Sequence, residues 1–593
     1  GTDGADHGTV ANAFIAFLQI SDPGSMAQDQ FSSQWFMVAA IVAGTGGVIM
    51  VSILIAFVTT ALDTRLSKLR RGHSQVVENG HTLILGWEEQ RVVEIIRELA
   101  IANESERKRA VVVLADRDKE YMDDYLSLQL PDTKTTRVIT RSGSPASLAN
   151  LGVVSVATAK SAVVLAECSE AAPAREKAES DARVIKTLLA LEADQSTSHR
   201  INVVAELFGV EARSMCDSIG VGSITAVDIT SVLARILVQT SRSVGLSVVY
   251  NEVLSFEGAE FYVFQGLWEG LSFRDASCRF PNGMPIAIKA ADGSITINPD
   301  LERGLADTDQ LIVLAEDDST IRFEREPVAT QREMTAPGGR KERRPERQLV
   351  IGWGPKAERL VGEYAEYVLP GSRVDIMPRS TRGLDPHVEG LVVEVLPHDP
   401  LDPRTWETVD PLNYDHVILL SEGDPDATAE AVDAETIMIL LLLRGAIRRA
   451  EGTHTGRNTT VVTELVESGN QVVAPNVGVH DFVISSRIVS MLFAQIAEQP
   501  DMHELYESLL HEEGSEIYVK PISLYVSELP TELPFCDLMT LANSRGEICI
   551  GTKTKSKEDR ADLNYGVRLV PHKDEGIKLA EGDALVVLAE DEG

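Results

Sequence analysis

Several common motifs are missing from this sequence of 593 residues, and each absence argues against a class of protein. The five cysteines form no CxxC pair, which argues for reduced thiols rather than a disulfide framework or a zinc site. No HExxH motif occurs among the 12 histidines, and no GxGxxG follows a strand-like segment, which weighs against a zinc hydrolase and a dinucleotide-dependent enzyme. Lys and Arg number 55 against 90 Asp and Glu, a net charge of −35, which argues against nucleic acid as a partner.

Charged side chains are also missing from the whole of Phe31–Leu62. About 20 apolar residues are enough to cross a bilayer as a helix, and a soluble helix of this length normally carries a polar stripe. We therefore predict a membrane-spanning helix, with a buried central helix of a large soluble protein as the weaker alternative. The basic cluster within Asp63–Arg71 predicts that this end of the helix, and the chain after it, is cytoplasmic.

A shorter apolar segment, Val10–Ile20, precedes the charge-free stretch and is too short to span a bilayer. A short apolar helix, a tight loop and a full span are the layout of a pore helix, a selectivity filter and an inner helix. Rings of Asp favour cations in such filters, whereas an ordinary surface turn is the alternative. The predicted filter residues are Ser21, Asp22, Pro23 and Gly24.

Two further expectations concern this membrane module. Gly44, Gly46 and Gly47 lie in the middle of the predicted span, where they permit bending and so form a candidate gating hinge; close helix packing is an equally good explanation. Because a pore helix normally follows an outer helix, we expect at least one further span upstream of this sequence.

From Gly80 the pattern changes to short strands rich in Val, Ile and Leu that alternate with helices, which predicts a mainly parallel sheet in a Rossmann-like lobe. Asp228–Val248 is predicted as one long helical segment that links two lobes, and Phe256–Asp317 as a small α+β lobe. The expected strands of the first lobe are His81–Gly86, Val111–Asp116, Arg137–Thr140, Ser161–Leu165 and Ile201–Ala205, and its expected helices are Gln90–Ala102, Tyr121–Leu130 and Asp181–Leu191.

The second half of the chain repeats the first. The words LILGW, VVAEL, EFYV and LAED in the first half return in the same order as LVIGW, VVTEL, EIYV and LAED, which indicates a duplicated structural unit. The predicted domains are a pore module over 1–72, a Rossmann-like lobe over 80–225 with linking helices and a small lobe over 226–323, a linker over 324–347, and the second pair of lobes over 348–480 and 481–593.

The order of these parts resembles that of channels gated by RCK domains, which regulate K+ conductance. The segments Gly80–Trp87, Leu99–Ser105, Val111–Glu120 and Arg141–Pro145 resemble the CASTOR/POLLUX family, the plant symbiosis channels of the nuclear envelope and their bacterial relatives. The resemblance implies a homotetramer around one pore, with two tandem RCK domains per subunit in a gating ring that binds a ligand, often Ca2+. Because the loops are short, we expect a bacterial relative in the inner membrane.

Two departures from known motifs limit what the resemblance implies. The K+-channel filter sequence TVGYG is absent, and the loop with Asp22 stands in its place, so K+, Na+ and Ca2+ all stay open as the permeant ion. Gly86–Arg91 and Gly352–Ala357 stand where a dinucleotide fingerprint belongs. Glu88 and Glu89 in the first of these work against a phosphate, so we expect neither NAD nor another nucleotide there.

Carboxylates at the ends of predicted strands are the candidate ligands for Ca2+, which prefers oxygen atoms. Helix N-termini and solvated loops also favour acidic residues, and this is the plainer explanation for each residue alone. The candidates are Glu88, Glu89 and Asp116 in the first copy and Asp399, Asp402, Glu422 and Asp424 in the second.

These observations favour a ligand-gated cation channel subunit without catalytic activity. A nucleotide-binding regulatory subunit of a K+ transport system is the alternative, against which the charge-free span argues. A dinucleotide-dependent enzyme is the weakest reading, since no Ser/His/Asp or Cys/His constellation is present in either copy.

Overall fold

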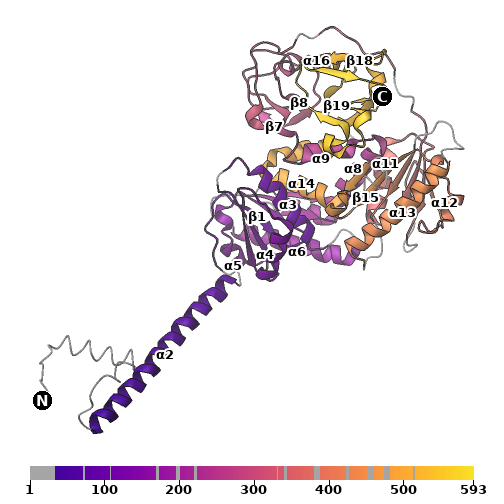
Figure 1. Ribbon diagram of the computed structural model, residues 1–593. Coiled ribbons are helices and arrows are strands. Elements are labelled where there is room, and N and C mark those ends of the chain that lie inside the picture. The colour runs from indigo at the N-terminus through magenta and orange to yellow at the C-terminus, as the bar shows by residue number, and fades with distance from the viewer. Residues whose placement is uncertain are drawn as a thin grey trace. The chain divides into compact units, whose positions relative to one another are not determined.

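The structure is a computed structural model, and the chain divides into two compact units that we describe separately (Figure 1). One unit contains helix α2 and Asp118–Tyr121, and the other contains Gln75–Arg117 and Met122–Gly593. The residues that the structure describes are 34–70, 74–106, 108–168, 172–194, 201–219, 224–329, 332–339, 343–379, 387–421, 427–450, 459–472, 481–511 and 514–592.

Helix α2 extends over Gln34–Arg70, and it continues without a break through the three candidate hinge residues Gly44, Gly46 and Gly47. Its large apolar side chains are exposed on several sides; the Phe57 ring, for example, is 71% exposed. Among the helices of the described ranges, none combines the length and the apolar character that a membrane crossing requires. The predicted pore module is therefore not confirmed, and its filter lies outside the described residues.

The first Rossmann-like lobe is built on a six-stranded parallel sheet in the order β3-β2-β1-β4-β5-β6. The inner strands are buried on both faces, as their runs of Val, Ile and Leu predict. All five predicted strands are confirmed, and β6 adds a sixth. The elements are β1 (Thr82–Leu85), α3 (Glu89–Ala102), β2 (Ala110–Ala115), α4 (Lys119–Gln129), β3 (Arg137–Ser142), α5 (Leu148–Val153), β4 (Ser161–Val164), α6 (Ala174–Asp194), β5 (Asn202–Leu207), α7 (Val210–Ser218) and β6 (Ile224–Asp228).

The segment expected as one long helix consists of two, α8 (Ile229–Arg242) and α9 (Leu246–Leu254). The helix ends here because Gly245 has a φ of +91°, a left-handed conformation that a side chain disfavours. The first small lobe follows, with an antiparallel sheet in the order β7-β10-β8-β9. Its elements are β7 (Glu260–Phe264), α10 (Phe273–Ser277), β8 (Met284–Lys289), β9 (Ile295–Ile297) and β10 (Gln310–Ala315).

The second half of the chain has the same architecture, which confirms the predicted duplication. Its parallel sheet has the order β13-β12-β11-β14-β15-β16, and its small lobe has the order β17-β22-β19-β20 with an added pair, β18-β21. The elements are β11 (Arg347–Ile351), α11 (Pro355–Tyr367), β12 (Arg373–Met377), β13 (Val392–Val395), α12 (Thr405–Thr408), β14 (His416–Leu419), α13 (Ala429–Ala450), β15 (Thr460–Leu465), β16 (Asp481–Ile484), α14 (Ser485–Glu498), α15 (His503–Leu509), β17 (Glu516–Pro521), β18 (Thr531–Pro534), α16 (Phe535–Asn543), β19 (Ile548–Lys553), β20 (Val567–Leu569), β21 (Gly576–Leu579) and β22 (Ala584–Ala589).

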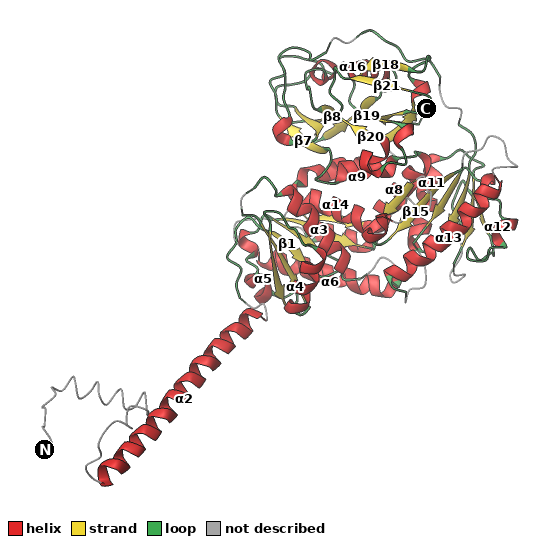
Figure 2. Ribbon diagram, in the orientation of Figure 1, coloured by secondary structure: helices red, strands yellow, loops and turns green. Residues whose placement is uncertain are grey.

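The two copies exchange their linking helices. Helix α8 of the first copy packs against α11 of the second, and α14 of the second packs against α3 of the first. Figure 2 shows α9 between the strands of the small lobes and α14. The largest hydrophobic cluster therefore contains residues of both copies, such as Ile96 and Leu233 from the first and Leu360 and Ile488 from the second. Neither copy buries its linking helix alone, so the tandem pair is one folding unit.

Candidate functional site

The carboxyl end of the first parallel sheet, where doubly wound folds bind ligands, is filled by an internal ion pair. Arg91 on α3 forms a buried ion pair with Glu206 on β5, and the two residues are 2% and 0% exposed. The guanidinium also donates to the carbonyl oxygen of Cys168 at 2.8 Å. The other carboxylate oxygen of Glu206 accepts from the backbone N–H of Ala166 at 2.9 Å. The Arg91 guanidinium thus occupies this edge, and Glu206 already neutralises its charge.

The second copy repeats this arrangement with a lysine as the base. The Nζ atom of Lys356 on α11 lies 2.5 Å from a carboxylate oxygen of Glu464 on β15, and both residues are buried. The other carboxylate oxygen of Glu464 accepts from the backbone N–H of Ser421 at 3.0 Å. Glu206 and Glu464 belong to the repeated words VVAEL and VVTEL. The repeat therefore preserves a buried acid at the edge of each sheet together with a base on the first helix.

The predicted ligand residues of the first copy lie near this edge but do not form one site, and a carboxylate oxygen of Glu88 lies 3.3 Å from Nε of Arg91 instead. Glu88 caps the N-terminus of α3, where its side chain accepts from the backbone N–H of Arg91 at 2.8 Å. Glu89 lies in the first turn of α3, and Asp116 follows β2 with an exposed side chain. Over the residues that the structure describes, no three His, Cys, Asp or Glu side chains are grouped so that they hold a metal.

Two of the second-copy candidates, Asp399 and Asp402, lie on loops. Asp399 accepts from the backbone N–H of Leu401 at 2.9 Å, and Asp402 forms a bidentate ion pair with Arg404. The hydrogen bonds from Arg404 lower the pKa of the partly exposed Asp402 carboxyl. Glu422, Asp424 and the filter residues Ser21, Asp22, Pro23 and Gly24 lie outside the described residues.

A hydrogen-bond network that the sequence did not predict joins the first small lobe to the second copy. Glu260, at the start of β7, accepts from the Tyr262 hydroxyl at 3.0 Å and, more weakly, from the Gln495 amide on α14 at 3.5 Å. Glu260 is 6% exposed, and burial raises the pKa of its carboxyl to about 7. The linking helix of the second copy therefore contacts a polar group inside the first small lobe.

The reciprocal network joins the second small lobe to the first copy. Glu516, at the start of β17, accepts from the Tyr518 hydroxyl at 2.6 Å and from the Gln239 amide on α8 at 2.7 Å. Burial raises the pKa of the Glu516 carboxyl as well. The three pairs of equivalent residues, Gln239/Gln495, Glu260/Glu516 and Tyr262/Tyr518, are each 256 residues apart. The sequence signal for the two glutamines is that they have the same spacing as the repeated EFYV and EIYV words.

A third contact between the copies centres on Arg242, the last residue of α8. Its guanidinium lies 2.8 Å from the carboxylate of Glu346 and 2.6 Å from that of Glu592, and 5.7 Å from the centre of the Tyr367 ring. Glu346 also lies 3.3 Å from Nε2 of His416. Although burial opposes it, contact with His416 and Arg242 lowers the pKa of Glu346 to about 2. Arg242 thus ties the first linking helix to both ends of the second copy.

These sites share one chemical character: their acids and bases are largely buried and paired, either within one Rossmann-like lobe, as in Arg91–Glu206, or between the copies, as in Arg242–Glu346. Such groups hold elements in register and are costly to separate. They suit a structure in which movement of one lobe is transmitted to the next, and they present no activated nucleophile to a substrate.

The comparisons with known proteins agree with the architecture. The family model described as Castor and Pollux, part of voltage-gated ion channel, matches residues 230–331, from α8 to beyond the first small lobe. The chain is 30% identical to the ion channel DMI1 of Medicago truncatula, over 99% of this chain and 69% of that protein. It is 28% identical to the ion channel CASTOR of Lotus japonicus, over 98% of this chain and 70% of that protein.

A solved structure, the human SLO3 gating ring, has the same fold. It superposes with a TM-score of 0.58 at 14% identity, over 86% of this chain and 98% of that one. The relatives are named as ion channels rather than enzymes, which confirms the prediction of a protein without catalytic activity. The curated relatives are plant proteins, so a bacterial origin stays a prediction. This chain belongs to the Castor and Pollux family of ion channels.

Proposed function

We propose that this chain is one subunit of a ligand-gated cation channel, in which the tandem lobes form part of a gating ring. Membership in an ion-channel family carries the proposal. The exchanged helices support it, because they turn two lobe pairs into one unit that a bound ligand moves as a whole. The expected assembly is a homotetramer in a lipid membrane, with K+ or another cation as the permeant ion.

The pore in this proposal is made by the N-terminal part of the chain. Helix α2 is the inner helix, supported by the charge-free sequence up to Leu62 and by its exposed apolar side chains. The loop around Asp22 is the filter, and the basic cluster after Asp63 marks the cytoplasmic side. In the sequence, α2 ends at Arg70 and the second unit begins at Gln75, with residues 71–74 between them.

Ca2+ is the proposed regulator, bound by carboxylates of the second copy. In the sequence, Glu422 and Asp424 follow β14, and ligands of this fold class bind at the carboxyl ends of the strands. The buried Lys356 at that edge is already neutralised by Glu464, so this ammonium group is not available to a phosphate. A hard cation with oxygen ligands is therefore the better match than NAD or another nucleotide.

Current through the purified full-length protein in a planar bilayer tests the proposal. We expect cation current whose selectivity or conductance changes in Asp22→Asn, whereas the matched variant Asp29→Asn, seven residues away, behaves like the wild type. We expect cytoplasmic Ca2+ to change the open probability, and the double variant Glu422→Gln/Asp424→Asn to weaken this response. If a confirmed tetramer passes no current under any ionic condition, the channel proposal fails and a regulatory subunit of a K+ transport system becomes the better explanation.

A further inference from the structure

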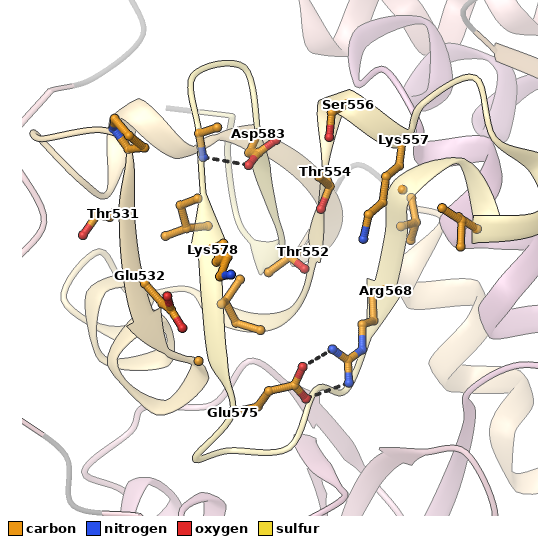
Figure 3. Close-up of a pocket in the computed structure, with 18 residues that line it drawn as sticks. Thr531, Glu532, Thr552, Thr554, Ser556, Lys557, Arg568, Glu575, Lys578 and Asp583 are labelled. Atoms are coloured by element: carbon orange, nitrogen blue, oxygen red, sulfur yellow. Dashed lines mark hydrogen bonds and ion pairs between the residues drawn. The ribbon is translucent and has the colours of Figure 1, made fainter.

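The second small lobe contains a cavity of about 960 Å³ that lies apart from the parallel sheets (Figure 3). One wall is the added strand pair β18–β21, and the opposite wall is β20 together with the loop that precedes it. The volume lies at the upper end of the range for small-molecule sites in proteins, roughly 300–1,000 Å³. The charge and polarity of its lining side chains decide which class of ligand fits.

The acidic side chains of this cavity are mostly occupied by the protein itself. Glu575 forms a bidentate ion pair with Arg568, with one of the two contacts at 2.7 Å. Asp583 is buried and accepts from the backbone N–H groups of Lys555 and Ala580, both at 2.8 Å. Glu532 is therefore the one acidic residue of the lining that is not tied up in this way.

The lysine side chains of the cavity differ from its acidic side chains in this respect. Lys557 and Lys578 are exposed, and in the part of the chain that the structure describes neither forms an ion pair with a carboxylate. Figure 3 shows Lys557 directed toward the space that Thr552, Thr554 and Lys578 also border. In a chain with a net charge of −35, two unpaired ammonium groups beside hydroxyl groups form a local site for an anion.

The first small lobe lacks these features, so they do not follow from the fold itself. The loop between β8 and β9 covers residues 290–294, whereas the loop between β19 and β20 covers residues 554–566 and supplies Lys557. In the second lobe, the antiparallel strands β18 and β21 place Glu532 opposite Lys578. At the corresponding place the first lobe has a single β-bridge between Ser272 and Gly304. The insertion and the added strand pair, which distinguish the second small lobe from the first, together build this cavity.

We propose that this cavity binds a small phosphorylated molecule. Lysine ammonium groups bind phosphate as point charges, threonine and serine hydroxyls donate further hydrogen bonds, and Leu563, Ile577 and Leu579 offer apolar surface to the rest of the ligand. The site is distinct from the proposed Ca2+ site at the sheet edge. Whether its occupancy changes gating rests on the proposed function, but binding itself does not.

Isothermal titration calorimetry on the purified full-length protein tests the proposal at fixed ionic strength. The probes are inorganic phosphate, ADP and inositol trisphosphate, so that a nucleotide source and a headgroup source of phosphate are separated. We expect one of the two organic phosphates to bind more tightly than inorganic phosphate. In the double variant Lys557→Gln/Lys578→Gln we expect at least about a tenfold loss of affinity, since two charge-assisted contacts are removed.

The matched control is Lys108→Gln/Lys186→Gln, which removes two exposed lysines of the first copy. It is expected to bind like the wild type, which separates a loss of contacts from a loss of net charge. If no probe binds the wild-type protein, or if the two double variants bind equally well, the proposal is overturned. Because calorimetry needs no ion flux, a failure here is distinguishable from a failure of the channel proposal.

Discussion

Replacement of Arg242 by methionine provides the sharpest test of how the two copies are held together. Methionine preserves most of the apolar volume of the arginine stem but removes the charge, so Glu346 and Glu592 lose the cation that lies 2.8 and 2.6 Å away. Breaking a buried ion pair by removing one partner costs about 3–5 kcal/mol. Loss of the contact with the Tyr367 ring adds about 0.5–1 kcal/mol.

Partial exposure of the two carboxylates reduces this figure. The Glu346 and Glu592 side chains are 20% and 18% exposed, so water replaces part of the lost interaction. We therefore expect the free energy of unfolding of Arg242→Met to fall by about 3 kcal/mol, the lower end of the range. Arg242→Lys is expected to restore only part of it, because one ammonium group does not reproduce the fork that contacts both carboxylates at once.

Urea denaturation of the full-length protein, followed by circular dichroism, measures the change as a shift in midpoint. The pH dependence gives a second readout. The folded-state pKa of Glu346 is lowered to about 2, so its stabilising contribution is present above the unfolded value, 4.5, and is lost as the pH falls toward 2. In Arg242→Met, the free energy of unfolding should depend less steeply on pH in this acidic range. A loss below about 1 kcal/mol, the size measured for exposed ion pairs, would refute the reasoning.

Three other predictions follow from buried titratable groups. Burial raises the folded-state pKa of Glu260 to about 7. Its contribution to the free energy of unfolding is therefore present below pH 4.5 and is lost as the pH rises through 7. Glu260→Gln should remove this pH-dependent loss of stability, which is worth at most about 3 kcal/mol, in thermal unfolding scans from pH 4 to 8. Lys356→Met leaves Glu464 buried without its base and should cost about 3–5 kcal/mol in urea denaturation, whereas adding Glu464→Gln should recover part of that loss. Lys573 is 2% exposed and donates to the Gly283 carbonyl at 2.6 Å, and burial lowers its pKa to about 7. The unfolded chain therefore binds more protons between pH 7 and 10.5, so stability should rise with pH there in the wild type but not in Lys573→Met.

The fold of the two lobe pairs was predictable because it depends on local patterns that the sequence repeats. Apolar runs such as Val111–Ala115 fit strands buried on both faces, and the LILGW and LVIGW words each mark the first strand and the turn after it. The break at Gly245 was missed because the residues on both sides are helix-compatible. Only the tertiary structure places this glycine beside Lys553, whose Nζ atom would lie 2.6 Å from an added Cβ.

The candidate site was less predictable, because its partners lie more than a hundred residues apart in the sequence. Glu206 and Glu464 were visible as repeated acids, but nothing local shows that Arg91 and Lys356 turn toward them. Glu88 looked like a ligand because of its position after a strand, yet its carboxylate caps the helix that begins there. The fully buried acid that pairs with Arg91 at the sheet edge is the one on β5, more than a hundred residues away in the sequence.

The ends of the two linking helices show how a duplicated chain keeps its copies in one arrangement. Helices α8 and α14 each contain 14 residues and end on residues of opposite charge, Arg242 and Glu498. Arg242 contacts Glu346 of the second copy, and Glu498 forms an ion pair with Lys160 of the first. Were the helices to dock on the wrong lobes, Arg242 would meet Lys160 and Glu498 would meet Glu346, and both contacts would be repulsive. The charge reversal between the copies thus favours the exchanged arrangement over its competitor.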